Sequence, residues 1–303
     1  MDSVKDTMNN LNIMSSIEDD EYLKQLKAEY LSCPEAIKEI KRLGIPEEKI
    51  DESLIKIHDF VNDLKYCLNC PGMDKCQKTN PLLKVNLVYT HGFIERELTP
   101  CDKMLQKVEI QSRFKVHDFD NEWLDNDITK LDKTRGRAQA LKKYLDYTKD
   151  LSDSWIFLTG EQNTGRSYFA ASLALDLARR TKGDICYINA PLRFKELSDF
   201  SLKNKNKYQE VLDLYCNAVL LVIDDFGSEF KNDFTRDAIL MQIITKRSAK
   251  KLLTIFTSDY TIDELETLYS PNKIAAIQAN RIFKIIRNES QGEISLGELS
   301  LYR

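Results

Sequence analysis

The sequence predicts an α/β domain with a parallel sheet flanked by helices, preceded by a small helical domain that contains a β-hairpin. Three observations support this prediction. From residue 135 onward, short apolar segments alternate with segments of helical periodicity. A glycine-containing loop at residues 160–167 joins one apolar segment to the next helical one. Residues 17–66 carry only helical periodicity, and a cysteine-rich segment follows them.

Length and composition agree with two globular domains. The chain of 303 residues is long for one domain, and 42% hydrophobic with 30% charged residues is typical of globular proteins. No apolar run reaches the length of about 18 residues that a membrane span needs. The first residues lack the basic and apolar segments of a secretory signal. We therefore expect a cytoplasmic protein without membrane attachment.

The charge distribution argues against nucleic-acid binding by bulk charge. The net charge is −4, and the first 60 residues hold 8 basic and 14 acidic residues. A protein that binds DNA mainly by charge would be basic. The acidic N-terminal part therefore favours a protein partner, and any DNA contact has to be local.

The first predicted domain covers residues 1–105. The helical periodicity of residues 17–66 is interrupted at Pro34 and again at Gly44-Ile45-Pro46. Two segments of alternating polarity, 83–89 and 93–98, flank a short turn and predict the hairpin.

Four cysteines of this domain predict a structural zinc site. They are Cys67, Cys70, Cys76 and Cys101. Four thiolates can complete a tetrahedral zinc site, and the C-x-x-C spacing of the first pair is a strong signal. The hairpin explains the long gap before Cys101, because it returns the chain to the neighbourhood of Cys76. The alternative is a set of unlinked thiols in a reducing compartment.

Residues 106–134 are rich in charge, lack a sustained period and are expected to be a linker. The second domain then covers residues 135–303. Strands are predicted at residues 155–159, 185–189, 218–223 and 252–257. Helices are predicted at residues 138–147, 167–180, around 192–214, 236–249 and from residue 262 onward.

The candidate phosphate site has the spacing of a P-loop, G-x-x-x-x-G-K-[ST], with Arg166 in the lysine position. Glycines let backbone N–H groups surround phosphates, and the next helix offers its N-terminus to the anion. The candidate nucleotide-binding residues are Gly160, Glu161, Gln162, Asn163, Thr164, Gly165, Arg166, Ser167 and Tyr168. Arginine keeps the positive charge and can pair with phosphate oxygens, so ATP is the expected ligand.

An apolar strand that ends in Asp224 and Asp225 supplies the second half of such a site. Asp224 is expected to hold Mg²⁺ together with Ser167, and Asp225 to orient or deprotonate the attacking water. The alternative is a glycine-containing turn beside a core strand that ends in solvated acids. The agreement of two motifs in the right order favours the nucleotide site.

The second domain resembles the AAA+ ATPases, in particular bacterial helicase loaders of the DnaI/DnaC type. The residues that carry the resemblance are 160–171, 223–229, 234–237 and 257–260. The cysteine-rich part with its hairpin resembles the helicase-interaction domain of the same loaders. The resemblance implies an AAA+ P-loop domain that uses ATP and Mg²⁺, and a role in DNA replication within the primosome. It implies binding to the hexameric replicative helicase through the N-terminal domain, contact with single-stranded DNA, and self-association through the AAA+ domain.

The resemblance also implies three further site residues. Asp259 falls where the family has its sensor 1 asparagine, Arg247 where an arginine finger for a neighbouring subunit is found, and Arg281 where a sensor 2 arginine is expected. The alternative for Arg247 is a solvated helix end, since it lies in a basic run. The alternative for Arg281 is a surface position. Asp259 and Arg166 both depart from the family pattern, which predicts weak hydrolysis.

Two other functions remain open from the sequence. The chain could be an adaptor for the helicase that binds nucleotide but hydrolyses it weakly or not at all, which the departures at positions 166 and 259 favour. It could also be a transposon-type AAA+ regulator, which recruits a transposase. The cysteine-rich N-terminal segment disfavours the regulator.

Overall fold

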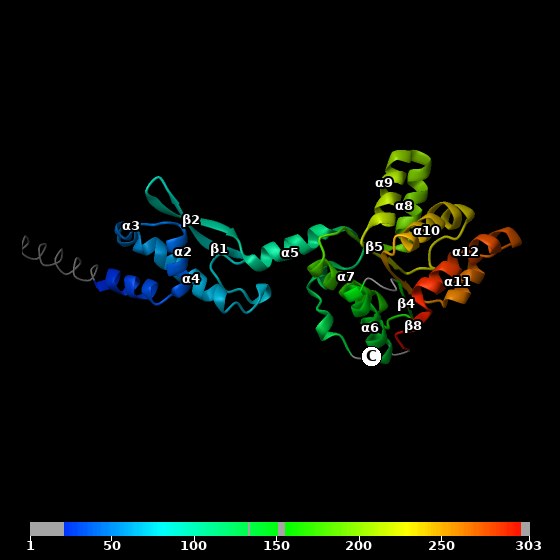
Figure 1. The fold of residues 1–303 in the computed structure, drawn as a ribbon, viewed down its shortest axis with the longest axis horizontal. Coiled ribbons are helices and arrows are strands. Elements are labelled where there is room, and N and C mark those ends of the chain that lie inside the picture. Colours follow the sequence, from blue (N-terminus) through cyan, green and yellow to red (C-terminus); the bar gives the residue numbers. More distant parts are fainter. Residues whose placement is uncertain (1–20, 133, 151–154, 298–303) are drawn as a thin grey trace, which may run out of the picture. The chain divides into compact units, whose positions relative to one another are not determined.

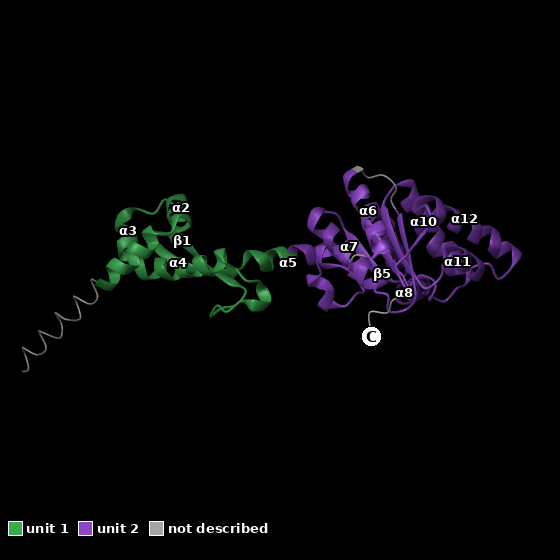
Figure 2. Cartoon of the chain, turned by 90° about the horizontal axis from the view of Figure 1, so that it is seen from below, with its two compact units in different colours: residues 1–108 green, residues 109–303 purple. Residues whose placement is uncertain are grey.

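The computed structural model describes residues 21–132, 134–150 and 155–297. The chain divides into two compact units, residues 1–108 and 109–303 (Figure 2). Each unit has its own hydrophobic core. Among the described residues, no helix combines the length and the apolar character needed to cross a membrane.

The described residues of the N-terminal unit form helices and one β-hairpin (Figure 1). Residues 21–31 are helical and precede α2 (Pro34–Arg42), α3 (Glu47–Glu52), α4 (Leu54–Leu68), the 3₁₀ turn η1 (Met73–Lys75), β1 (Leu83–Thr90) and β2 (Phe93–Pro100). The predicted hairpin is confirmed, and His91 and Gly92 make its turn with φ of 52° and 81°. Leu87 and Ile94 join the hairpin to the helical core around Ile57.

The second unit contains a six-stranded parallel sheet in the order β3-β5-β6-β7-β4-β8. Its strands are β3 (Phe114–His117), β4 (Trp155–Thr159), β5 (Ile185–Asn189), β6 (Leu220–Asp224), β7 (Leu253–Ser258) and β8 (Glu293–Ser295). The predicted parallel sheet flanked by helices is thus confirmed, and β8 is a short strand that the sequence pattern did not predict.

Helices cover both faces of this sheet (Figure 1). They are α6 (Arg135–Asp150), α7 (Arg166–Arg180), α8 (Ala190–Lys203), α9 (Lys205–Asn217), the π-helical η4 (Phe234–Leu240), α10 (Met241–Ala249), α11 (Ile262–Leu268) and α12 (Lys273–Ser290). Alternate residues of β4 enter different cores: Trp155 packs with α8–α10 and α12, whereas Ile156 packs with α6 and α7. This alternation explains why every residue of β4 is buried.

The structure does not have the separate linker expected at residues 106–134. Helix α5 (Asp102–Arg113) leads into β3, which pairs with β5 at the sheet edge. The turns η2 (Asn121–Asp125) and η3 (Ile128–Lys130) then contact α7, where the rings of Trp123 and Tyr168 lie 5.5 Å apart. A strand of four residues is too short to show a period, and α5 buries none of its residues. The sequence periodicity therefore gave no signal for α5 or β3.

Candidate nucleotide-binding site

The candidate residues gather at the carboxyl edge of the sheet. Thr159 at the end of β4 is paired with Ser258 at the end of β7, and Asn189 at the end of β5 with Asp224 at the end of β6. The segments that follow these strands therefore meet at one edge, where ligands of open α/β sheets bind.

The loop from Gly160 to Gly165 is compact and depends on its glycines. Gly160, Asn163 and Gly165 have φ of 153°, 64° and 77°. A Cβ atom on Gly160 would lie 3.0 Å from Thr164 Oγ1 and 3.2 Å from the carbonyl oxygen of Gly297. Gly165 is the N-cap of the 15-residue helix α7. The loop thus ends on a helix N-terminus, whose free N–H groups favour an anion.

Ser167 and Asp224, the two predicted Mg²⁺ ligands, lie together. The buried carboxylate of Asp224 accepts hydrogen bonds from the hydroxyls of Thr257 and Ser167. Burial raises the pKa of Asp224, and the bond from Thr257 partly offsets this rise. Carboxylate and hydroxyl oxygens are the donors that Mg²⁺ prefers, so the residues present fit this ion.

Tyr187 is a part of the site that the sequence analysis missed. Its hydroxyl donates to the backbone carbonyl of Ser167 at 3.1 Å and also lies within hydrogen-bond reach of Asp224. Burial raises the pKa of Tyr187 well above its ordinary value, so the hydroxyl stays protonated. Its place on β5, next to β6, is the only signal that could have identified it.

Asp225 is held by two neighbours. Its backbone is left-handed, with φ of 55°, and its N–H donates to Thr257 Oγ1 at 3.1 Å. Asn189 Nδ2 donates to Asp225 Oδ2 at 2.9 Å. The carboxylate is therefore oriented by a side chain of the adjacent strand. Asn189 and Thr257 were not predicted, because their role depends on strand order.

Arg166 and Asp259, which both depart from the expected pattern, contact each other. Arg166 Nη2 forms an ion pair with Asp259 Oδ1. Arg166 Nη1 donates to the carbonyl oxygens of Gly160 and Ser258, the latter at 2.5 Å. The guanidinium therefore connects the P-loop to the end of β7.

Comparisons with known proteins identify the family of this chain. The family model described as "IstB-like ATP binding protein" matches residues 91–287. The chain belongs to the IstB-like ATP-binding family. It is 23% identical over 230 residues to the replicative helicase loader DnaI of Bacillus subtilis, covering 73% of each chain. A crystal structure of DnaI matches with 22% identity and a TM-score of 0.54, covering 63% of this chain and 98% of the other. The predicted resemblance to loaders of the DnaI/DnaC type is thus confirmed.

Arg247, the predicted arginine finger, does not lie at the protein surface, where it would have to be to reach a neighbouring subunit. The side chain is fully buried. Its guanidinium donates to Thr254 Oγ1 and to the carbonyl oxygens of Tyr215, Ala218 and Leu253, at distances between 2.5 and 2.9 Å. A side chain inside the core cannot reach a neighbouring subunit, so the predicted finger role is wrong for this conformation. The basic run around Arg247 concealed its burial.

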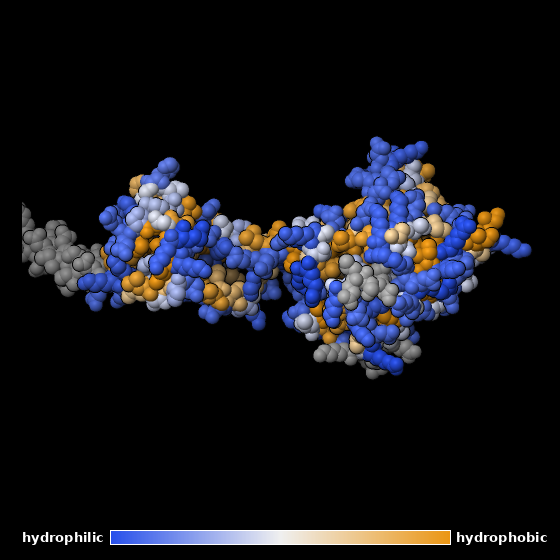
Figure 3. Space-filling view, in the orientation of Figure 1, coloured by the Kyte–Doolittle hydropathy of each residue, from blue (hydrophilic) through white to orange (hydrophobic). Residues whose placement is uncertain are grey.

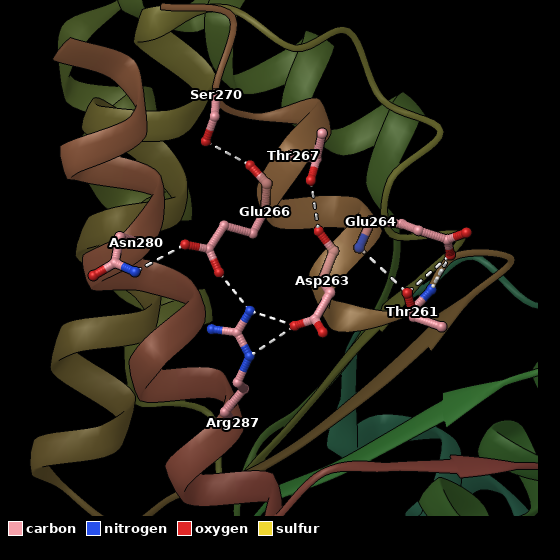
Figure 4. A network of polar contacts seen from close by, with 8 residues as sticks. All are labelled: Thr261, Asp263, Glu264, Glu266, Thr267, Ser270, Asn280 and Arg287. Atoms are coloured by element: carbon pink, nitrogen blue, oxygen red, sulfur yellow. Dashed lines mark hydrogen bonds and ion pairs between the residues drawn. The ribbon is translucent and has the colours of Figure 1, made fainter. Parts of the chain in front are cut away.

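Arg281, the predicted sensor 2 residue, is exposed on α12, where its guanidinium lies 3.5 Å from Gln278 Oε1. The structure records no contact between it and the described P-loop residues. Arg287 on the same helix binds the carboxylates of Asp263 and Glu266 on α11 (Figure 4). Arg287 therefore joins two helices, and Arg281 is the arginine of the two that stays accessible.

A largely apolar cavity of about 660 Å³ lies beside the P-loop of this IstB-like domain, between η3, α6 and α7. Leu141, Leu145 and Phe169 are among its lining residues, and Arg137 is a polar one. Arg137 Nη2 donates to the carbonyl oxygen of Thr164 in the P-loop at 3.1 Å. Its buried Nε has no hydrogen-bond partner among the described residues. A cavity of this size can hold a flat aromatic group.

The four predicted zinc ligands line one small cavity of about 20 Å³ in the N-terminal unit, together with Lys78. Lys78 Nζ lies 3.4 Å from Cys67 Sγ and 2.5 Å from Asp63 Oδ1. Within the described ranges, however, no three Cys, His, Asp or Glu side chains are arranged as a metal site. The cysteines share one location, but the structure does not show the predicted zinc centre.

Proposed function

We propose that this protein is a cytoplasmic, ATP-dependent loader that places the replicative DNA helicase on single-stranded DNA during initiation or restart of replication. The observation that carries the proposal is the similarity to the loader DnaI over 73% of both chains. This similarity covers more of the chain than the family model does, since 230 aligned residues exceed the 197 of residues 91–287.

The site residues have defined roles in this proposal. Residues 160–168 would hold the phosphates of ATP, and Ser167 with Asp224 would hold Mg²⁺. The bound ion would neutralise charge on the phosphates. Asp225, whose carboxylate accepts a hydrogen bond from Asn189, would orient the attacking water molecule. The apolar cavity lined by Arg137 would take the base of the nucleotide.

The N-terminal unit is the proposed site of helicase binding. Exposed apolar side chains on its helices include Tyr22, Leu31 and Ile55, with exposed fractions of 49%, 58% and 59%. Hydrophobic patches are visible on the surface of this unit in Figure 3. Exposed apolar residues of this kind favour a protein partner. Single-stranded DNA and a second copy of the chain would bind through the AAA+ domain.

A co-elution experiment with the full-length chain tests this proposal. The chain is expected to co-elute with the replicative helicase, and the helicase with single-stranded DNA is expected to stimulate ATP hydrolysis. The substitution Leu31→Glu is expected to weaken helicase binding at least about tenfold, as loss of a buried apolar anchor does. The matched control is Leu202→Glu, at a residue of the second unit that is 84% exposed. Equal binding by both variants would contradict the proposed interface.

We also propose that Cys67, Cys70, Cys76 and Cys101 bind structural zinc. The backbone N–H groups of Leu82 and Lys78 bond to Cys76 and lower its thiol pKa, and the N–H of Met104 lies 3.4 Å from Cys101 Sγ. Such bonds stabilise the thiolate form that a metal needs. Lys78 would have to leave Cys67 when the ion binds.

Zinc analysis of two alanine variants tests this second proposal. The purified chain is expected to contain about one zinc per molecule, as four thiolates complete a tetrahedral site. Cys101→Ala is expected to lose the metal and to lower the unfolding temperature. Cys33→Ala, a buried cysteine in the core of the same unit, is expected to keep it. A chain that contains no zinc, or a Cys101→Ala variant that retains it, would refute the site.

A helicase adaptor that binds nucleotide without efficient turnover is the second candidate function. The ion pair of Arg166 and Asp259 favours it, because it engages the cation that a P-loop offers to phosphate. The double variant Arg166→Lys with Asp259→Asn separates the two functions by its steady-state hydrolysis. A large gain over the parent chain would support the adaptor, and unchanged turnover would support the loader.

A further inference from the structure

The ion pair between Arg166 and Asp259 joins two segments that lie 93 residues apart in the chain. Arg166 begins α7, and Asp259 follows β7 directly. The Arg166 side chain is 9% exposed and that of Asp259 is 34% exposed. The arginine is therefore enclosed, whereas the aspartate has room to turn toward solvent.

The nitrogens that Arg166 would offer to a nucleotide are already engaged. Nη1 donates to the carbonyl oxygens of Gly160 and Ser258, and Nη2 binds the Asp259 carboxylate. A cation at this position of a P-loop reaches the β- and γ-phosphates. Because a carboxylate and a phosphate are both anionic acceptors, they compete for the same guanidinium donors.

We propose that Asp259 is an internal competitor of nucleotide phosphate, which pairs with Arg166 when no nucleotide is bound and has to be displaced before a nucleoside triphosphate binds. The proposal rests on the nucleotide-binding function proposed above. A displaced Asp259 stays anchored to the end of β7 by its backbone, so its negative charge remains near the phosphates. That charge repels a triphosphate more than a diphosphate, and the site consequently favours the diphosphate relative to a site with a neutral residue at position 259.

The same ion pair explains why both Arg166 and Asp259 differ from the family pattern. Arginine forms several hydrogen bonds in a fixed geometry, and here it bridges the P-loop, the end of β7 and a carboxylate. A neutral side chain at position 259 could still accept a hydrogen bond from Arg166, but it would lack the charge that strengthens the present contact. The guanidinium would then be more available to an anion.

Nucleotide titration of the full-length chain tests the proposal, with fluorescent analogues of ATP and ADP as probes. Asp259→Asn is expected to bind the ATP analogue about tenfold more tightly than the parent chain, the scale of one charged hydrogen bond. The gain for the ADP analogue is expected to be smaller. The matched control is Asp213→Asn on α9, which removes an exposed carboxylate that pairs with Lys246 at 3.2 Å. This control is expected to leave the affinities for both analogues unchanged.

The outcomes separate this proposal from the function on which it rests. A parent chain that binds nucleotide and an Asp259→Asn variant with equal or weaker ATP affinity would refute the competition alone. Absence of nucleotide binding by every variant would refute the nucleotide site and the competition together. Thermal unfolding checks that each variant is folded. Asp259→Ser is a second neutral variant with the same expected order of affinities, and it replaces the first if that one is unfolded.

Discussion

Replacing Arg247 by methionine is expected to lower the free energy of unfolding by about 3 kcal/mol or more, since each unpaired buried acceptor costs about 1–3 kcal/mol. The guanidinium donates to the carbonyl oxygens of Tyr215, Ala218 and Leu253, which come from α9, the residue after it and β7. Methionine fills part of the space but donates no hydrogen bond. Burial lowers the pKa of Arg247 to about 10, so the native side chain still carries its charge at neutral pH.

Chemical denaturation of the variant and of a matched control checks this expectation. Arg281→Met makes the same change at an exposed position of α12 and is expected to alter the free energy of unfolding by less than about 0.5 kcal/mol. A stable Arg247→Met variant that loses ATP hydrolysis would restore the finger role that the burial of Arg247 argues against. Loss of stability would confirm its structural role in the core.

The substitution Asp225→Asn is expected to lower Mg²⁺-dependent ATP turnover by about a hundredfold or more, the range for loss of a general base. The Asp225 carboxylate accepts a hydrogen bond from Asn189 at 2.9 Å, which orients it at the carboxyl edge of the sheet. Asparagine keeps the size of the side chain but cannot accept a proton at neutral pH. Nucleotide affinity is expected to stay within about twofold, because no phosphate contact is removed.

Comparison with Asp224→Asn gives this test its specificity. Asp224 is the proposed Mg²⁺ ligand beside Ser167, so its substitution is expected to weaken both Mg²⁺-nucleotide binding and turnover. Steady-state kinetics and nucleotide titration distinguish the two patterns. Equal turnover by Asp225→Asn and the parent chain would show that Asp225 does not activate water.

Much of the second unit could be predicted from local pattern. The strands of the sheet centre are continuous apolar runs, and the loop at residues 160–167 carries its own spacing signal. β8 and β3, with three and four residues, are too short for such a pattern and are defined only by their pairing with β4 and β5. The segment that looked like a linker therefore belongs in part to the sheet.

The sequence by itself was enough to predict the P-loop, the acidic pair that follows a buried strand, the hairpin and the resemblance to helicase loaders. These features depend on residues that are close in the chain. Only the tertiary structure decided that Arg166 is paired with Asp259, that Asn189 holds Asp225, and that Arg247 lies in the core. The physical reason is that strand order brings residues from distant segments to one edge, and that burial depends on which helices cover a side chain. Neither property is encoded in local spacing.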